Sequence, residues 1–512
     1  MATAHHHTQA NKSISVSQYL RQQNFLFLLF SIAGMSFFFF LGFPFANHQE
    51  SYMWLPQLER INFLECFTNQ IYPVANHRPL GIATAWLTYH VSGDIYLQQF
   101  VNWLFAISSF IVLYFYCNNR VLFSLTAFVA GAGFFSGYIY LFHLQGVFYG
   151  PLQLYIAALL VLGGRSSSIS KRELIVLFAI AIVVAFFHPF VLFVFIAFLI
   201  GIYLELLLNK KHDLQRITIL LAVGTAITWW LLVPALPSES LQYAFIGGIV
   251  SYKLIEINAL IGLLSLLLGG YVIWDKPFAG RFRYILFIVL IPCSILFFFA
   301  KIPLLLIWIA ACCLKMLLMR KWAMVSLIGA TALLPFATAT GSPTYAVFVI
   351  MACIYCTCFN ATWIIKKRFV QVFAYFMLVL LAVLFLLSAT GYHVPVINKF
   401  LSPILAEKEK TFQLEKIIKT HISTYSSQGF SLQLVDSANY PVHSKNNIER
   451  LHRPPTNQFF LDQYLKQTNV DSSRKKLLVT FGDQKVEGAK MILEEKGIWN
   501  GSAFVFELVR SQ

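Results

Sequence analysis

The residues most able to do chemistry in this sequence are ionisable side chains that stand at the ends of long apolar stretches. Placing such groups there is costly, so each needs a functional or structural reason. Five of the six histidines between residues 8 and 391 fall on one side of the apolar stretches: His48, His77, His90, His143 and His188. Six carboxylates share that side: Glu50, Glu59, Glu65, Asp94, Glu239 and Glu256. Histidines and carboxylates exchange protons with bound molecules, so we expect any reaction to take place on this side.

The composition is that of an integral membrane protein. The 512 residues are 58% hydrophobic and 12% charged, with a mean hydropathy of +0.68, whereas soluble domains carry about 25% charged residues. This excludes a cytosolic enzyme and a disordered scaffold. The net charge of +16 does not indicate a nucleic-acid partner, because the basic residues are spread over many short segments.

Apolar stretches long enough to cross a membrane divide the chain into three parts. Residues 1–22 form a cytoplasmic N-terminal arm, residues 23–391 a multispan membrane domain, and residues 392–512 a small extracytoplasmic α/β domain. We count 13 stretches of about 20 residues, the length that a spanning helix needs: 23–44, 96–117, 120–142, 145–164, 173–187, 189–208, 217–236, 255–274, 284–300, 302–319, 322–339, 344–364 and 369–391. The expected fold is therefore an all-α polytopic membrane protein with an appended α/β domain.

The basic residues predict the orientation. Short cytoplasmic loops keep an excess of Lys and Arg. With the N-terminus inside, 18 basic residues of the membrane domain and its arm face the cytoplasm, Lys315 among them, and four face outward: Arg60, Arg78, Lys253 and Lys301. We therefore expect a multi-pass protein of the inner (plasma) membrane, with a cytoplasmic N-terminus and a periplasmic or extracellular C-terminal domain.

The first external loop, residues 45–95, is the longest polar stretch inside the membrane domain. Apolar residues between Met53 and Phe67 follow an imperfect helical stripe, which predicts a helix lying in the membrane interface. A second short helix is predicted from Pro79, a residue favoured in a first helical turn, to about His90. Such a loop shapes a cavity at the membrane surface.

The run NHRPLGIATAWLTYHVSGDIYLQQFVNWLF, residues 76–105, resembles a segment of polytopic GT-C glycosyltransferases of the mannosyltransferase or aminoarabinose-transferase kind. In those proteins an Arg-Pro-Leu helix follows the first external loop, and a polar turn and a span with polar residues near its start come next. The matching positions here are Arg78, Pro79, Leu80, Gly93, Gln98 and Asn102. Family members also carry acidic residues after the first span, where this chain has Glu50 between Gln49 and Ser51. Because Glu50 stands alone, a divalent metal stays possible and no cofactor is certain.

The resemblance implies transfer of a sugar from a polyprenyl-phosphate donor to a lipid, glycan or protein acceptor on the outer face, usually with inversion. Arg78 would then hold the donor phosphate with its planar guanidinium. Glu50 would be the catalytic base that takes the acceptor's proton. The alternatives are an arginine touching lipid headgroups and a solvated loop glutamate.

Seven further residues are substrate-binding candidates on the same side: His48, His77, Asp94, His143, His188, Lys301 and Tyr345. Each has a plainer alternative. Asp94 is in position to cap the helix that follows, and His188 precedes a proline and could simply end a helix. His143 and the nearby Tyr149 fit a sugar-binding wall or an interfacial aromatic belt equally well.

Other classes of function remain open. A transporter or flippase would place polar residues at mid-membrane in paired repeats, which this sequence lacks, and a polysaccharide polymerase or ligase would have its long loop late in the chain. Cys353, Cys356 and Cys358 resemble a metal spacing, but helix packing is the better interpretation. In the C-terminal part, strands are predicted at 476–481 and 503–508, with helix-like stretches at 407–421 and 485–496.

Overall fold

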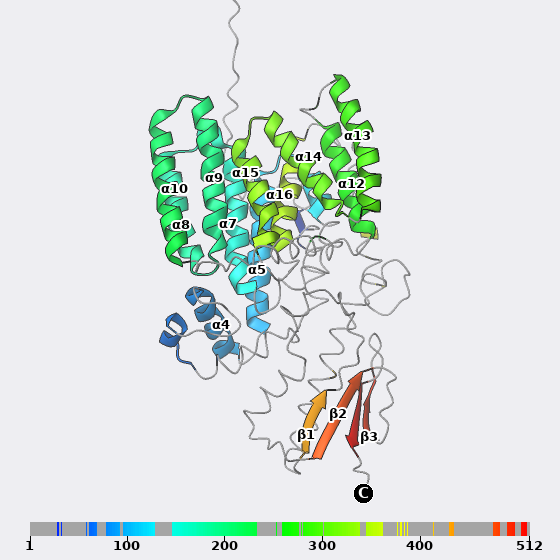
Figure 1. The fold of residues 1–512 in the computed structure, drawn as a ribbon. Coiled ribbons are helices and arrows are strands. Elements are labelled where there is room, and N and C mark those ends of the chain that lie inside the picture. The colour runs from blue at the N-terminus through cyan, green and yellow to red at the C-terminus, as the bar shows by residue number, and fades with distance from the viewer. Residues whose placement is uncertain are drawn as a thin grey trace, which may run out of the picture.

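The part of the chain that the computed structural model describes is mainly helical (Figure 1). The described residues are 61–68, 78–92, 96–127, 146–232, 259–275, 280–300, 302–337, 345–361, 430–434, 475–481, 489–496 and 503–508, with a few single residues between them.

The long helices lie where the apolar stretches predicted them. They are α5 (Tyr96–Tyr116), α7 (Gly146–Gly164), α8 (Lys171–Ala185), α9 (Phe190–Leu208), α10 (His212–Leu232), α12 (Ala259–Trp274), α13 (Gly280–Phe299), α14 (Leu305–Leu318), α15 (Trp322–Leu333) and α16 (Ala346–Cys358). Within the described residues, four segments are both long and apolar enough to cross a membrane: Leu97–Tyr116, Phe190–Leu208, His212–Leu232 and Gly280–Phe297. These helices support a membrane protein, while the count of 13 spans stays a prediction.

Helix α9 lies between α10 and α15 in the bundle. At Gly201 the two backbones of α9 and α15 come so close that a Cβ atom would lie 2.4 Å from the Cα of Ala323. Gly150 plays the same part between α7 and α5, since a Cβ there would lie 2.8 Å from the Cβ of Phe105. Glycine at these two positions lets helices approach at short range, as is common between membrane helices.

A buried carboxylate that the sequence analysis missed joins three elements. Glu205 of α9 is 5% exposed. Its Oε1 accepts a hydrogen bond of 3.0 Å from the backbone N–H of Ala323 in the first turn of α15, and its Oε2 accepts one from the hydroxyl of Ser166. Because the first N–H groups of a helix have no partner within the helix, Glu205 serves as a cap for α15 supplied by a neighbouring helix.

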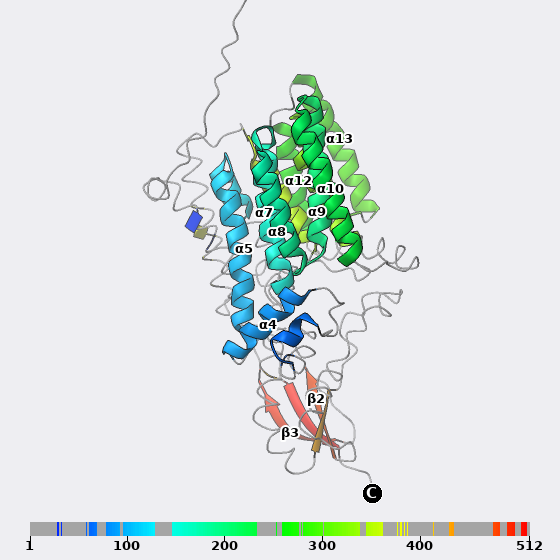
Figure 2. The same ribbon diagram turned by 90° about the vertical axis from the view of Figure 1, so that its left-hand side faces the viewer.

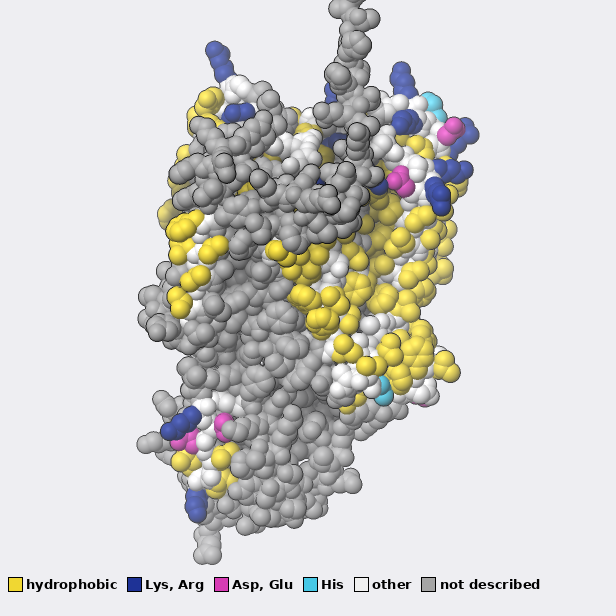
Figure 3. All heavy atoms as spheres, turned by 180° about the vertical axis from the view of Figure 1, so that it is seen from behind, with side chains coloured by type: hydrophobic (Ala, Val, Ile, Leu, Met, Phe, Trp, Pro, Cys, Tyr) yellow, Lys and Arg dark blue, Asp and Glu magenta, His cyan; other side chains and the backbone are white. Residues whose placement is uncertain are grey.

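Many of the described basic residues of the helical part lie at one end of the bundle (Figure 3). They occupy the connections α7–α8, α9–α10 and α14–α15, which contain Arg165, Lys210, Lys211, Arg320 and Lys321. The α8–α9 connection, at the other end, has no Lys or Arg. These three basic connections thus share one end of the bundle, and the described side chains between the two ends are mostly apolar on the face that Figure 3 shows.

A short helix lies beneath the opposite end of the bundle. Helix α4 (Pro79–Ser92) begins at the proline, as predicted, and runs two residues past His90. Before it, the predicted in-plane helix is described only in part, and there it is a single 3-10 turn, η1 (Leu64–Phe67). The indole Nε1 of Trp86 donates to the carbonyl of Ile61 at 2.9 Å, which fixes η1 against α4. Figures 1 and 2 both show α4 on the side of the bundle where the β-sheet lies.

The C-terminal part contains a four-stranded mixed sheet in the order β1-β2-β4-β3. The strands are β1 (Phe430–Leu434), β2 (Lys475–Phe481), β3 (Ala489–Glu495) and β4 (Ala503–Leu508). Strand β1 is parallel to β2, and the other pairs are antiparallel. The strand predictions for 476–481 and 503–508 are confirmed. The helical part of the predicted α/β domain stays a prediction.

The prediction of a helix at 485–496 is wrong, because residues 489–495 form strand β3. The Glu and Lys residues of this stretch favour a helix locally. Strand β4 nevertheless supplies an antiparallel partner for its backbone, and pairing of this kind overrides a weak local preference. Of the predicted helix 407–421, only Gln413 is described, and its Nε2 donates to the carbonyl of Glu495 in β3 at 3.2 Å.

Candidate functional site

Three of the predicted substrate-binding residues meet at the end of the bundle above α4. Arg78 precedes the first turn of α4, His188 lies between α8 and α9, and Tyr345 is the residue before α16. The imidazole Nε2 of His188 lies 3.0 Å from the hydroxyl of Tyr345. Tyr149, from the first turns of α7, brings its hydroxyl to 3.2 Å from that of Tyr345. We call Arg78, Tyr149, His188 and Tyr345 the Tyr345 cluster.

The helix ends position this cluster. After α8 the chain makes one more turn, in which the backbone N–H of His188 donates to the carbonyl of Val184 at 2.9 Å. Pro189 is the N-cap residue of α9, so the histidine is held in a tight junction. His188 thus lies where a helix ends, as predicted, and its side chain enters a polar cluster, while substrate binding by His188 stays a prediction.

Two hydrogen bonds define the state of the His188 ring. The backbone N–H of Phe190 donates to Nδ1 at 3.3 Å, so Nδ1 carries no proton. In the neutral ring the proton is then on Nε2, which donates it to the Tyr345 hydroxyl. His188 is 0% exposed, and this burial, together with the positive charge of Arg78, lowers the pKa of His188 well below its ordinary value. The histidine is thus a neutral hydrogen-bond donor.

Tyr345 is the centre of the cluster. It is 3% exposed and surrounded by the rings of Tyr149, Phe190 and Phe348 at centroid distances of 5.3, 5.6 and 6.2 Å. The Arg78 guanidinium is within hydrogen-bonding reach of the hydroxyl. Tyr345 therefore faces a fixed cation.

Buried amides lie on α7, which carries Tyr149 of this cluster, and on the neighbouring helix α5. Gln98 and Asn102 of α5, which belong to the segment resembling GT-C proteins, are 0% and 3% exposed. Gln153, one turn after Tyr149 on α7, is also buried, and its Nε2 faces the sulfur of Met351 at 3.9 Å. Helices α4, α5 and α7 contact one another. The interior at this end of the bundle is thus richer in polar groups than the apolar spans suggest.

The remaining predicted site residues lie outside the described part of the chain. They are the predicted base Glu50 and the substrate-binding candidates His48, His77, Asp94, His143 and Lys301. Among the described residues, no group of three or more His, Cys, Asp or Glu side chains is placed to hold a metal ion. The described cysteines are free thiols. Two of them pair with backbone carbonyls of α16, Cys312 with that of Cys353 and Cys117 with that of Cys358, both at 3.7 Å.

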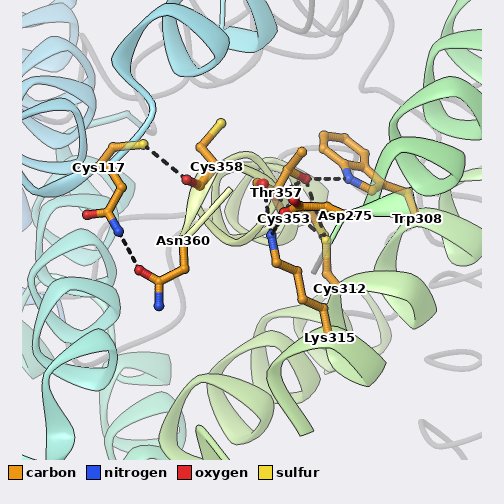
Figure 4. A network of polar contacts seen from close by, with 10 residues as sticks. Cys117, Asp275, Trp308, Cys312, Lys315, Cys353, Thr357, Cys358 and Asn360 are labelled. Atoms are coloured by element: carbon orange, nitrogen blue, oxygen red, sulfur yellow. Dashed lines mark hydrogen bonds and ion pairs between the residues drawn. The ribbon is translucent and has the colours of Figure 1, made fainter. Parts of the chain in front are cut away.

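A second polar centre joins α12, α14 and α16 (Figure 4). The Nζ of Lys315 lies 3.0 Å from Oδ2 of Asp275 and 3.1 Å from the carbonyl oxygen of Thr357. Both charged side chains are 0% exposed. The hydroxyl of Thr357 accepts from Nε1 of Trp308 at 2.9 Å and donates to the carbonyl of Cys353 at 2.7 Å. We call Asp275, Trp308, Lys315 and Thr357 the Lys315 network.

Lys315, counted from the sequence among the basic residues on the cytoplasmic side, is buried and not exposed to water; its side of the membrane stays a prediction. Lys315 belongs to the last turn of α14 and points into the bundle, because Asp275 at the end of α12 and a carbonyl of α16 together solvate its ammonium group. A signal was present: Lys315 is the one charged residue of α14. A charge in an apolar helix indicates a buried partner, but the partner's identity depends on how distant helices pack.

Comparisons with known proteins identify no relative: no protein-family model, no curated protein and no solved structure matches the chain.

Proposed function

We propose that this protein is a membrane glycosyltransferase that moves a sugar from a polyprenyl-phosphate donor to an acceptor hydroxyl on the external face of the membrane. The observation that carries the proposal is the convergence of Arg78, from the segment that resembles GT-C enzymes, with the buried Tyr149, His188 and Tyr345. A half-buried guanidinium beside hydroxyl donors suits an oxyanion such as a phosphate.

The surroundings of Arg78 suit a lipid-linked donor. Helix α4 and η1 carry large apolar side chains that are well exposed: Leu64 at 75%, Leu87 at 53% and Val91 at 69%. In an outward-facing membrane interface such side chains lie among the acyl chains. An isoprenoid tail would therefore find apolar surface along the helix that begins next to the cation holding its phosphate.

The proposed reaction breaks one bond at the anomeric carbon of the sugar and forms another. The bond between the anomeric carbon and the phosphate oxygen breaks, and the electron pair leaves with the polyprenyl phosphate. A bond forms between the anomeric carbon and the acceptor oxygen, whose proton passes to a carboxylate. Arg78 would neutralise the negative charge that grows on the phosphate as the bond breaks. Electrostatic stabilisation of this kind is usually the largest single contribution to catalysis. Glu50 is the proposed proton acceptor.

A transporter or flippase is the second candidate, and the Lys315 network is the observation that favours it. Buried ion pairs inside membrane domains often mark ion or substrate pathways. However, Lys315 is in the last turn of α14 and Asp275 follows the last turn of α12, so the pair lies towards one end of the bundle. The Tyr345 cluster lies at the other end, where a reaction at the membrane surface would take place.

The test measures release of polyprenyl phosphate from lipid-linked sugars by the purified protein in vesicles. A total lipid-linked sugar extract serves as donor, and mass spectrometry of the lipid products identifies which sugar is consumed. Wild type should release the carrier only when an acceptor fraction is added. Because one charge-assisted contact is worth roughly 1.5 to 3 kcal/mol, Arg78→Ala and Arg78→Lys should bind the donor about ten- to a hundredfold more weakly.

The matched control is Arg165→Ala, which removes an arginine that is exposed at the other end of the bundle and pairs with Glu173 at 3.1 Å. This control should keep full activity. Movement of intact lipid-linked sugar across the vesicle bilayer without release of the carrier would reject the glycosyltransferase and favour the flippase.

A further inference from the structure

Among the described residues, the Tyr345 hydroxyl is next to two groups that only donate hydrogen bonds, His188 and Arg78, and to the hydroxyl of Tyr149, which can donate or accept. His188 offers it the proton on Nε2 at 3.0 Å, and Arg78 offers N–H groups and has no acceptor atom. A phenol oxygen has room for about two incoming hydrogen bonds. With these two in place, the hydroxyl proton of Tyr345 points away from both donors, towards Tyr149 or towards a molecule bound beside Arg78.

The tautomer of His188 fixes this polarity. Backbone N–H groups donate and never accept, so the contact from Phe190 to Nδ1 at 3.3 Å is compatible only with an unprotonated Nδ1. A proton on Nδ1 as well would make that nitrogen a donor and place its N–H against the backbone N–H of Phe190. The junction between α8 and α9 therefore holds His188 in the one neutral form that donates to Tyr345, and a ring held in this way has no free nitrogen to take a substrate proton.

We propose that Arg78, Tyr345 and His188 form an oxyanion subsite in which His188 is a positioning residue that directs the Tyr345 hydroxyl proton onto a phosphate oxygen of an isoprenoid lipid. This inference rests on the proposed function for its choice of lipid, but it assigns new roles: Tyr345 is a direct phosphate ligand, and His188 acts through Tyr345 and is not a base. The guanidinium of Arg78 and the imidazole N–H of His188 favour an acceptor such as an oxyanion, and the positive charge of Arg78 disfavours ammonium groups.

Two substitutions of His188 separate its two hydrogen bonds. In His188→Asn the amide oxygen occupies the place of Nδ1, so it keeps the bond to Phe190 and loses the reach to Tyr345. In His188→Gln the amide nitrogen reaches the place of Nε2 and keeps the donor to Tyr345. If His188 only ended one helix and capped the next, His188→Asn would be the harmless variant. If it positions Tyr345, His188→Gln is the harmless one.

The experiment measures binding of farnesyl phosphate to the full-length protein in nanodiscs at constant salt, with farnesol as the same tail without the anion. Loss of a hydrogen bond to a charged group corresponds to about ten- to a hundredfold in affinity. We expect that loss for Tyr345→Phe and about tenfold for His188→Asn, whereas His188→Gln should stay within about threefold of wild type. Farnesol binding should not differ among the variants.

Tyr155→Phe is the matched control. It removes a buried hydroxyl from the same helix as Tyr149, but that hydroxyl donates to the carbonyl of Leu177 at 2.9 Å, away from the Tyr345 cluster. Its affinity for farnesyl phosphate should equal that of wild type. Thermal unfolding in detergent checks that each variant is folded. Tyr345→Phe keeps the ring and its packing, so it tests the subsite even where a His188 variant does not fold.

Three results would overturn the proposal: unchanged affinity in Tyr345→Phe, equal losses in His188→Asn and His188→Gln, or weaker farnesol binding in parallel with farnesyl phosphate. Phosphatidate, added as competitor, distinguishes the source of the phosphate, and displacement at equal affinity would refute the isoprenoid assignment. Binding is measured without sugar transfer. The subsite therefore stands if binding follows the expected pattern and no sugar is released, while the proposed function fails.

Discussion

Removing one partner of the Lys315–Asp275 pair should destabilise the protein far more than removing both. Both side chains are 0% exposed, so the partner that is left behind cannot reach water. Breaking a buried pair in this way costs about 3–5 kcal/mol. In Lys315→Met, the chain length and packing of the side chain are kept, and the ammonium group that contacts Asp275 at 3.0 Å and the Thr357 carbonyl at 3.1 Å is lost.

A double-mutant cycle measures the coupling. Lys315→Met and Asp275→Leu should each lower the free energy of unfolding by about 3–5 kcal/mol, which would give about 6–10 kcal/mol if the sites were independent. The double variant should instead lie close to wild type, because replacing a buried pair by apolar residues is often neutral or stabilising. Detergent-induced unfolding in mixed micelles gives the four free energies from shifts in the midpoint.

The exposed pair Arg165–Glu173 provides the control for this cycle. Its side chains are 47% and 36% exposed at a separation of 3.1 Å. Exposed pairs contribute about 0–1 kcal/mol, so Arg165→Ala should have little effect on the midpoint. Additive losses in the Lys315 cycle would refute the reasoning, since the two charges would then be stabilised by groups other than each other.

Three further predictions concern the base, the cap of α15 and the topology. Glu50→Gln should lower the transfer rate by about 10²- to 10⁴-fold with donor affinity unchanged, and near-normal turnover would make Glu50 an ordinary loop residue. Glu205→Ala should lower the free energy of unfolding by about 1–3 kcal/mol, because the N–H of Ala323 loses a buried acceptor; Glu205→Gln keeps an acceptor and should lose less, so equal losses would contradict the capping role. Reporter fusions placed after Arg120, Arg216 and Lys367 should give a cytoplasmic signal, and a fusion placed after Gly391 an external one. A cytoplasmic signal after Gly391 would reverse the predicted side of the C-terminal domain.

The sequence by itself determined where most of the described helices lie and how their charges are distributed. Pro79 marked the start of α4, because proline fits a first helical turn. Continuous apolar runs predicted α5, α7 and α9 to within about two residues, since a membrane helix must satisfy its own backbone over the whole span. The distribution of Lys and Arg between these apolar runs predicted which connections between helices are basic. These properties depend on residues close together in the chain, which is why local reading was sufficient.

Long-range pairing decided the features that the sequence analysis missed. Strand β3 has helix-favouring residues, but an edge of β4 was available to it. Lys315 and Glu205 look like charges in apolar runs, and only the packing of α14 against α12 and of α9 against α15 brings them their partners. No local signal specified either partner, because each lies 40 or more residues away in the chain.

The Tyr345 cluster shows both contributions at one site. Residue type and the predicted side of the membrane selected Arg78, His188 and Tyr345 separately from the sequence. Their contact could not be predicted, since His188 and Tyr345 are 157 residues apart and Tyr149 and Tyr345 are 196 apart. The packing of α7 against α9 and α16, and of all three helices against α15, brings these helix ends together. The tautomer of His188 was likewise decided by tertiary structure, because it depends on which donor faces each ring nitrogen once the helices are packed.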